Sequence, residues 1–256
     1  MKSNIRISFF VCCLLLTGSL FFSSCKKATI LTCQLGKYFI SDGTSTPKPN
    51  TFYYYDNGKL KKIAYANSDK DTFYYAADTI TILRFDDRDS LAGIFTGITD
   101  ASGNVLTASK SFYDYFGNIT GTDYYTNQYN ATQNLTQQNI SNSLGTTIVN
   151  LVYNGNNTAT GTKFIGAIQS EKYVFFHNST ENKTQIADFG GVLIPYFGKP
   201  SANLLDSMFV ITSSDTIRIK YVHELNENGY TVKTNKTYLS GIADTKYETY
   251  SYFNCK

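Results

Sequence analysis

Apolar and polar side chains alternate along most of this chain in short runs. Residues 51–55 and 59–65 show the pattern clearly, with tyrosines and aliphatic residues between polar ones. A period of two places successive side chains on opposite faces of a strand, which is typical of antiparallel sheets and not of helices. The same pattern predicts strands at 72–76, 79–85, 93–99, 105–113, 118–125, 146–153, 160–168, 172–177, 184–188, 207–212, 216–224, 230–239 and 246–253.

Short turns separate these runs. Asp56-Asn57-Gly58 lies between the first two strands, and Asn-Gly suits a type I′ hairpin because both residues tolerate positive φ. Similar glycine turns occur within 113–119 and 225–230. Strands joined in this way pair with their neighbours in sequence. We therefore expect an all-β fold: a single antiparallel β-meander, curved or barrel-like, with a β-sandwich as the alternative.

Two segments interrupt the alternation. Residues 127–143 consist largely of Asn, Gln and Thr, which predicts a long loop. Residues 197–206 contain Ser201, which would cap a single helical turn. Neither segment has the composition of a linker that would divide the chain into separate domains.

The first residues have the three parts of an export signal. Lys2 and Arg6 precede an apolar run at 7–16 that is too short to span a bilayer as a helix. Ser23 and Ser24 then place small side chains before Cys25, as a lipoprotein signal peptidase requires. Phe22 stands where the usual motif has leucine, and lipoproteins of the Bacteroidota resemble this chain in that looser pattern.

The signal fixes the expected domain boundaries and compartment. We predict a signal peptide at 1–24, a lipidated tether at 25–32 and an antiparallel β domain at 33–256. Cys25 would carry fatty acyl chains such as palmitate, enough for stable anchoring in the outer membrane. An ordinary secretory signal that leaves Cys25 as a thiol is the alternative. Surface lipoproteins of the Bacteroidota resemble one another in having acidic residues after this cysteine, whereas Lys26 and Lys27 follow it here, which favours the periplasmic face.

The cysteines of the mature chain predict a disulfide. Cys33 and Cys255 are the thiols left once the signal is removed and Cys25 is lipidated, and an oxidising envelope favours a disulfide between them. Two unpaired thiols are the alternative.

Two of the 23 basic residues lie in the signal, so 21 remain against 20 acidic ones. This near-neutral balance gives no electrostatic reason to expect a nucleic acid partner.

The chain resembles a Bacteroidota lipoprotein family of unknown function. The resemblance rests on the lipobox, the Tyr-Asp-x-Gly hairpins, the stretch Gly-Lys-Pro-Ser-Ala-Asn-Leu at 198–204 and the aromatic-then-cysteine ending at 252–255. It covers most of residues 30–256 and implies a porin-like β fold without known catalytic residues. The sequence departs from the pattern in having no tryptophan and in the polar stretch at 127–143.

Aromatic density is the main surface clue. There are 21 tyrosines and 18 phenylalanines. Alternation places Tyr53 with Tyr55, and Phe73 with Tyr75, on one face of each strand. Such a face would stack on sugar rings, and the alternative is a cross-strand aromatic ladder that holds the sheet together.

Modification sites follow from a second resemblance. Bacteroidota envelope proteins resemble one another in accepting O-linked sugar at Asp, then Ser or Thr, then an aliphatic or small residue. Thr79, Ser90, Ser207 and Thr216 match this pattern. A bulky glycan requires an exposed acceptor, which the fold must provide.

Enzyme signals are sparse. His177 and His223 have no partner at a recognised metal spacing, and Glu224 would lie on the opposite face from His223. Asp86, Asp87 and Asp89 form an acidic cluster that fits a hairpin turn better than a calcium loop. We expect no cofactor and no metal. The function expected is non-catalytic binding of a glycan or an envelope protein, with an assembly role or a hydrolase using acidic residues from separate strands as alternatives.

Overall fold

The computed structural model describes residues 34–41, 51–57, 59–183, 198–239 and 244–253, and every regular element in them is a strand. No helix among these residues is long and apolar enough to cross a membrane. The strands are β1 (Gln34–Ser41), β2 (Thr51–Asp56), β3 (Lys59–Tyr65), β4 (Lys70–Tyr75), β5 (Thr79–Phe85), β6 (Leu91–Thr99), β7 (Val105–Tyr113), β8 (Ile119–Tyr129), β9 (Leu135–Asn142), β10 (Gly145–Asn154), β11 (Asn157–Ile165), β12 (Ile168–Glu181), β13 (Asn203–Thr212), β14 (Thr216–Leu225), β15 (Thr231–Tyr238) and β16 (Asp244–Phe253).

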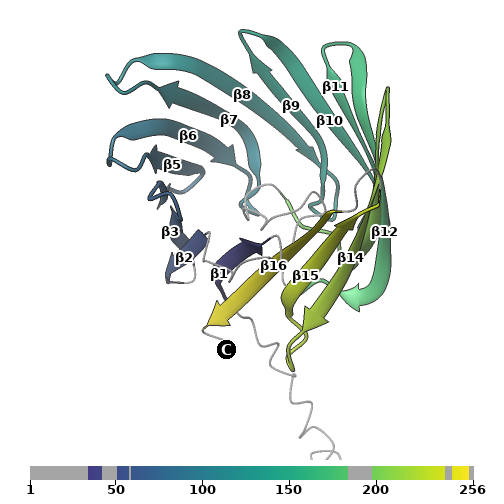
Figure 1. The fold of residues 1–256 in the computed structure, drawn as a ribbon. Coiled ribbons are helices and arrows are strands. Elements are labelled where there is room, and N and C mark those ends of the chain that lie inside the picture. Colours follow the sequence, from purple (N-terminus) through teal and green to yellow (C-terminus); the bar gives the residue numbers. More distant parts are fainter. Residues whose placement is uncertain (1–33, 42–50, 58, 184–197, 240–243, 254–256) are drawn as a thin grey trace, which may run out of the picture. The chain divides into compact units, whose positions relative to one another are not determined.

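The strands form one antiparallel meander, as the short links predicted (Figure 1). Each strand pairs with its neighbours in sequence, and β1 also pairs with β16, from Gln34 opposite Phe253 to Ser41 opposite Tyr247. The sheet therefore curls into a barrel whose seam is the short β1–β2 ladder, where Lys37 pairs with Phe52 and Tyr38 with Thr51. The sandwich alternative is wrong, because one continuous sheet supplies both walls.

Several hairpin turns share one hydrogen-bonding pattern. An Asp or Asn opens the turn, and its side-chain Oδ1 accepts hydrogen bonds from the backbone N–H groups two and four residues later. The fourth residue of each turn has positive φ, which glycine adopts without strain. Examples open at Asp86, Asp100, Asp114, Asn130 and Asn226. These turns hold the register of the strands on both sides.

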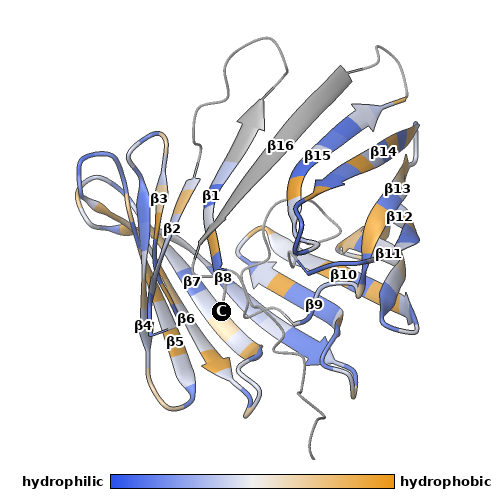
Figure 2. Cartoon of the chain, turned by 90° about the horizontal axis from the view of Figure 1, so that it is seen from below, coloured by the Kyte–Doolittle hydropathy of each residue, from blue (hydrophilic) through white to orange (hydrophobic). Residues whose placement is uncertain are grey.

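Apolar side chains gather at two places on the inner wall. One cluster joins β3, β4, β5 and β7 and contains Leu60, Ile63, Phe73, Ile80 and Val105. The other joins β12, β13 and β14 and contains Phe175, Leu205, Met208, Ile219 and Tyr221. Hydrophobic and hydrophilic segments are interspersed along the strands (Figure 2). The inner wall is thus partly apolar core and partly polar surface.

The polar segment at 127–143 is not the predicted loop. Its residues complete β8 and form β9. Their amides bond across the ladder: Gln138 donates to Asn127 at 3.1 Å, and Gln137 donates to Asn150 at 2.7 Å. Asn and Gln can serve a strand when neighbouring strands supply partners for their side chains, and a composition-based reading cannot see those partners.

The helical turn predicted near Ser201 is also wrong. Residues 198–202 are extended chain that leads into β13. The Ser201 hydroxyl oxygen, which is buried, accepts a hydrogen bond from the backbone N–H of Thr158 on β11 at 2.8 Å, so it does not cap a helix. The backbone N–H of Lys199 donates to Gln133 in the β8–β9 turn. This segment therefore runs past the turns at one end of the barrel. The predicted strand 184–188 lies outside the described residues.

Candidate functional site

A row of charged side chains lies on the inner wall beside the first apolar cluster. The alternation that turns Phe73 and Tyr75 of β4 inward also turns Asp71 inward. On β5, Arg84 is in phase with Ile80 and Ile82, and the register places it opposite Asp71. Antiparallel pairing thus brings together residues far apart in the sequence.

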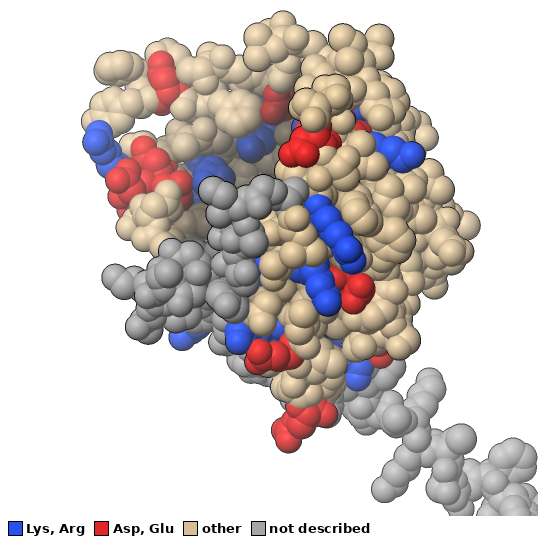
Figure 3. Space-filling model, turned by 45° about the vertical axis from the view of Figure 1, so that its right-hand side comes forward, with Lys and Arg blue, Asp and Glu red and all other residues tan. Residues whose placement is uncertain are grey.

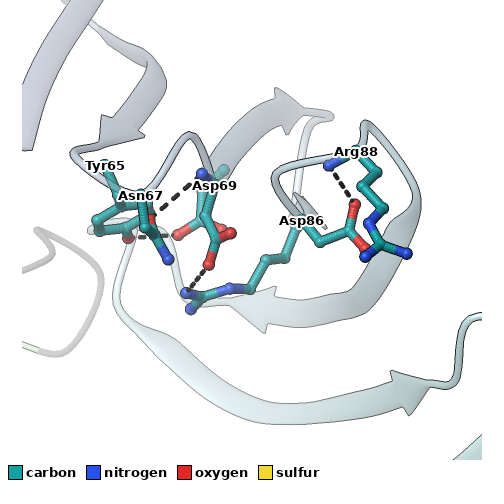
Figure 4. A network of polar contacts seen from close by, with 7 residues as sticks. Tyr65, Asn67, Asp69, Asp86 and Arg88 are labelled. Carbon is teal, nitrogen blue, oxygen red and sulfur yellow. Dashed lines mark hydrogen bonds and ion pairs between the residues drawn. The ribbon is translucent and has the colours of Figure 1, made fainter.

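Five residues define what we call the Asp71 cluster: Tyr65, Asp69, Asp71, Arg84 and Lys110. The Tyr65 hydroxyl donates to Asp71 Oδ2 at 2.6 Å, and Arg84 Nη2 donates to Asp69 Oδ2 at 3.2 Å. The Arg84 guanidinium also lies over the Tyr65 ring, 5.2 Å from its centroid. Figure 4 shows Tyr65 and Asp69 close together beside the β3–β4 turn, with Asp86 and Arg88 in the neighbouring turn.

Asp71 is the chemically distinctive member of this cluster. Only 8% of the residue is exposed, yet its Oδ1 has no hydrogen-bond partner among the described atoms. A buried carboxylate oxygen without a donor is costly, because it has lost water and gained nothing in exchange. The site therefore holds an unsatisfied acceptor, which a ligand hydroxyl or amine would reach only after neighbouring side chains move.

Burial disfavours the charged form of Asp71 in this cluster. Burial raises the pKa of the Asp71 carboxyl above its usual value, and the Tyr65 hydroxyl, Arg84 and Lys110 oppose this rise. Burial also raises the pKa of Tyr65, with the Asp71 hydrogen bond adding to the effect. The Tyr65 phenol consequently stays neutral and acts as a donor toward Asp71.

Solvent reaches other parts of the inner wall. The inward-facing pair Lys163 and Glu171, joined at 2.9 Å, keeps side-chain exposures of 33% and 27%. The Arg84 side chain is 42% exposed. Figure 3 shows the molecule hollowed on its upper left, with basic side chains inside the hollow and acidic ones near its edge. The barrel interior is therefore partly open to water and not fully packed.

The four aromatic residues singled out from the sequence lie together on this inner wall. Phe73 is a buried core residue, and Tyr53, Tyr55 and Tyr75 pack against the same cluster while remaining half-buried. The Tyr75 hydroxyl donates to the Leu60 carbonyl at 2.6 Å. Burial raises the pKa of Tyr55 to about 12. The aromatic face is thus an interior surface next to the Asp71 cluster.

The four glycosylation candidates differ in exposure. Thr216 is exposed at the start of β14, while Thr79 and Ser90 are half-buried. Ser207 is only 6% exposed, so the folded barrel does not offer its hydroxyl to a glycosyltransferase. Cys25, Cys33 and Cys255 lie outside the described residues, as does the whole predicted signal and tether.

The two histidines lie on separate strands, His177 on β12 and His223 on β14. His223 Nε2 lies 2.7 Å from the Leu205 carbonyl oxygen, and Nδ1 lies 2.9 Å from the Thr234 hydroxyl. A carbonyl only accepts, so Nε2 carries the proton. His223 links β14 to β13 where their ladder has ended, beside a cavity of about 230 Å³. Glu224 faces outward to Lys233 at 3.0 Å, and His177 is half-buried on β12.

The acidic cluster at 86–89 forms a turn. Asp86 Oδ1 accepts the backbone N–H groups of Arg88 and Ser90, and Asp89 bonds to Lys70. Across the described ranges, no group of three or more His, Cys, Asp or Glu side chains is placed to hold a metal ion.

Sequence reasoning missed the Asp71 cluster. The available signal was a pair of charged residues, Asp71 and Arg84, at strand positions where the alternation otherwise places inward-facing apolar side chains. A charge at such a position is often a functional feature, but only the strand register shows that the two meet.

Comparisons with known proteins support the fold. No protein-family model matches the sequence, and no curated protein is detectably similar to it. Among solved structures, a porin-like protein from Bacteroides uniformis matches with a TM-score of 0.64 and 15% identity, covering 88% of this chain and 98% of that one. A porin-like protein from Bacteroides vulgatus matches with a TM-score of 0.60 and 13% identity, covering 86% and 98%. At this identity the likeness shows a shared porin-like fold.

Proposed function

We propose that this protein binds a neutral oligosaccharide non-catalytically inside its barrel, at the Asp71 cluster. The observation that carries the proposal is the buried Asp71 Oδ1, an acceptor without a donor, next to Arg84, whose side chain is 42% exposed. A sugar hydroxyl would donate to this oxygen, and the half-buried rings of Tyr53 and Tyr75 would stack on a pyranose face. The acidic residues of the cluster, Asp69 and Asp71, are matched in number by the basic residues Arg84 and Lys110. This balance of charge favours a ligand without net charge.

The proposed location is the bacterial envelope. Cys25 would be the lipidated residue, with the barrel at the periplasmic face of the outer membrane. The fold shared with porin-like proteins of Bacteroides supports an envelope role. Incorporation of labelled palmitate by the wild-type chain, and its loss in Cys25→Ala, would test the anchor; absence of label from the wild type would reject it.

A disulfide between Cys33 and Cys255 is part of the same proposal. Gln34 and Phe253, the described residues nearest the two cysteines in sequence, are partners in the β1–β16 ladder. Such a bond would cross-link the two ends of the domain and limit the freedom of the unfolded chain.

Replacing Asp71 with asparagine should weaken oligosaccharide binding at least about tenfold, which corresponds to about 1.4 kcal/mol. Asparagine has nearly the same shape, but its amide nitrogen places a donor where the carboxylate offers an acceptor. Calorimetric titration with a panel of neutral xylo-, malto- and cello-oligosaccharides measures the effect.

Asp56→Asn is the matched control for this titration. Asp56 is an exposed carboxylate in the β2–β3 turn region and pairs with Lys61 at 3.4 Å. Its substitution should leave affinity unchanged. Equal loss in both variants, or binding that Asp71→Asn does not affect, would reject the assignment of the site.

A hydrolase is the second candidate, and one observation favours it. Asp71 has a raised pKa, while the nearby Asp69 carboxylate is paired with Arg84. A protonated and an ionised carboxyl are the two groups that glycoside hydrolysis uses. Release of reducing ends from the same oligosaccharide panel by the wild type, but not by Asp71→Asn, would identify hydrolysis in place of simple binding.

A further inference from the structure

The rim opposite the start of β1 carries an unusual set of exposed apolar side chains. Three neighbouring turns contribute to it: β7–β8, β9–β10 and β11–β12, which lie along the upper end of the barrel in Figure 1. The exposed fractions are 67% for Tyr115, 84% for Phe116, 60% for Ile119, 95% for Leu144, 57% for Ile165 and 75% for Ile168. We call these six residues the apolar rim.

The apolar rim is made of the tips of three separate turns. Alternate turns of a meander lie about 10 Å apart, because neighbouring strands are about 4.8 Å apart. The backbone N–H of Gly166 donates to the Thr146 carbonyl at 2.7 Å, which fixes the β11–β12 turn against β10. Separate convex tips suit a deformable apolar medium better than a folded protein, which would need a matching hollow for each tip.

Several backbone N–H groups of these turns are already paired. Asp114 Oδ1 accepts the N–H groups of Phe116 and Asn118, and Asn142 Oδ1 accepts the N–H of Leu144 at 2.9 Å. Unsatisfied backbone donors would make entry into a bilayer costly, so internal pairing of these groups removes that barrier.

Two of the three rim turns are uncharged. The turns Ser143-Leu144 and Gly166-Ala167 contain no ionisable residue, whereas the β7–β8 turn contains Asp114, whose carboxylate accepts backbone N–H groups of its own turn. The Arg88 guanidinium lies over the Tyr115 ring, 5.7 Å from its centroid, which places a cation beside an amphipathic aromatic residue as at lipid headgroups. The outer wall of β14, by contrast, exposes Arg218, Lys220 and Glu224. These charges disfavour lipid contact along β14.

We propose that the apolar rim inserts into the interfacial layer of a phospholipid bilayer. Residues such as Phe116 and Leu144 would enter by about 5–10 Å, the depth that interfacial elements reach. This contact is separate from a lipid anchor at Cys25 and from ligand binding at the Asp71 cluster. It would orient the barrel, with the rim in the lipid and the outer wall in water.

The chain offers a clean test because it contains no tryptophan. Phe116→Trp and Leu144→Trp each create a single emitter on the rim. Tyr74→Trp is the matched control, because Tyr74 is 54% exposed on the outer wall away from the rim. The full chain is reconstituted with phosphatidylcholine vesicles, with or without brominated acyl chains. The three variants are also compared in a Cys25→Ala background, because an anchor at Cys25 would hold the end of the barrel that carries Tyr74 at the bilayer.

Insertion predicts a clear difference between the variants. The rim tryptophans should emit at shorter wavelength with vesicles and be quenched by bromine several-fold more strongly than the Tyr74→Trp emitter. Water-like emission from the rim in every sample would overturn the proposal. Equal quenching at all three positions would also overturn it, since the barrel wall would then contact lipid. A wavelength shift without vesicles would assign the rim to association between protein copies instead.

Discussion

Phe73→Ala should lower the free energy of unfolding by about 3–5 kcal/mol, the range for truncating a buried phenylalanine. Only 4% of Phe73 is exposed, and it lies among Leu60, Ile63 and Ile80 in the first apolar cluster. Truncation removes buried apolar area and leaves a cavity that the rigid barrel wall fills poorly. Urea unfolding followed by circular dichroism measures the change.

The adjacent residue provides the control. Tyr74 is 54% exposed on the outer wall of the same strand, so Tyr74→Ala should cost far less, within about 1 kcal/mol. Similar costs for the two variants would mean that β4 does not have the alternation described. A small cost for Phe73→Ala alone would instead place that ring on an accessible surface.

Asp71→Asn should make the protein more stable than the wild type at neutral pH, and this advantage should shrink as the solution becomes acidic. Burial raises the pKa of Asp71 above its ordinary value near 3.8. Between the unfolded and folded pKa values the native state binds more protons than the unfolded state, so wild-type stability falls as the pH rises through this interval. Asparagine carries no charge to desolvate and still accepts from Tyr65 through its amide oxygen.

Asp114→Asn should show the opposite pH dependence. Hydrogen bonds from the Asn118 side chain and backbone, followed by those from Phe116 and Gly117, lower the pKa of Asp114. Its contribution to stability is therefore present above the unfolded pKa and is lost as the pH falls. Thermal unfolding of both variants and the wild type from pH 3 to 7 checks the pair. A difference for Asp71→Asn that does not change with pH, or that grows as the solution becomes acidic, would contradict the raised pKa.

Alternation predicted most strands because a curved sheet has an inner and an outer face. Residues 79–85 illustrate this: Ile80 and Ile82 turn inward, and the strand has the predicted bounds. The turns were predictable where an Asp or Asn opened them and a glycine held positive φ, as in 114–118. These signals are local, and a meander is built from local pairings.

β9 could not be predicted because its stability depends on partners. Leu135–Asn142 has few apolar residues, and its amides gain their hydrogen bonds only once β8 and β10 lie alongside. Ser201 was misread for a similar reason. It has the residue type of a helix cap, but its hydroxyl meets Thr158, 43 positions earlier in the chain.

The candidate site depends on register in the same way. Tyr65, Asp71 and Arg84 come from three strands, and the ladder alone decides that they share a wall. The aromatic residues at 53, 55, 73 and 75 were chosen correctly as a group that shares a face. The direction in which the sheet curves places that face inside the barrel. The sequence of a single strand does not show this direction.

The central claim is that a sugar reaches Asp71 inside the barrel, and the carboxyl ¹³C resonance of Asp71 reports on it most directly. Asp71→Asn assigns the signal by its loss. Without sugar, the titration midpoint should lie above the ordinary aspartate value of about 3.9. Addition of the neutral oligosaccharides should shift both the resonance and its midpoint, because a sugar hydroxyl then donates to Oδ1. An ordinary midpoint that no oligosaccharide alters would contradict the account.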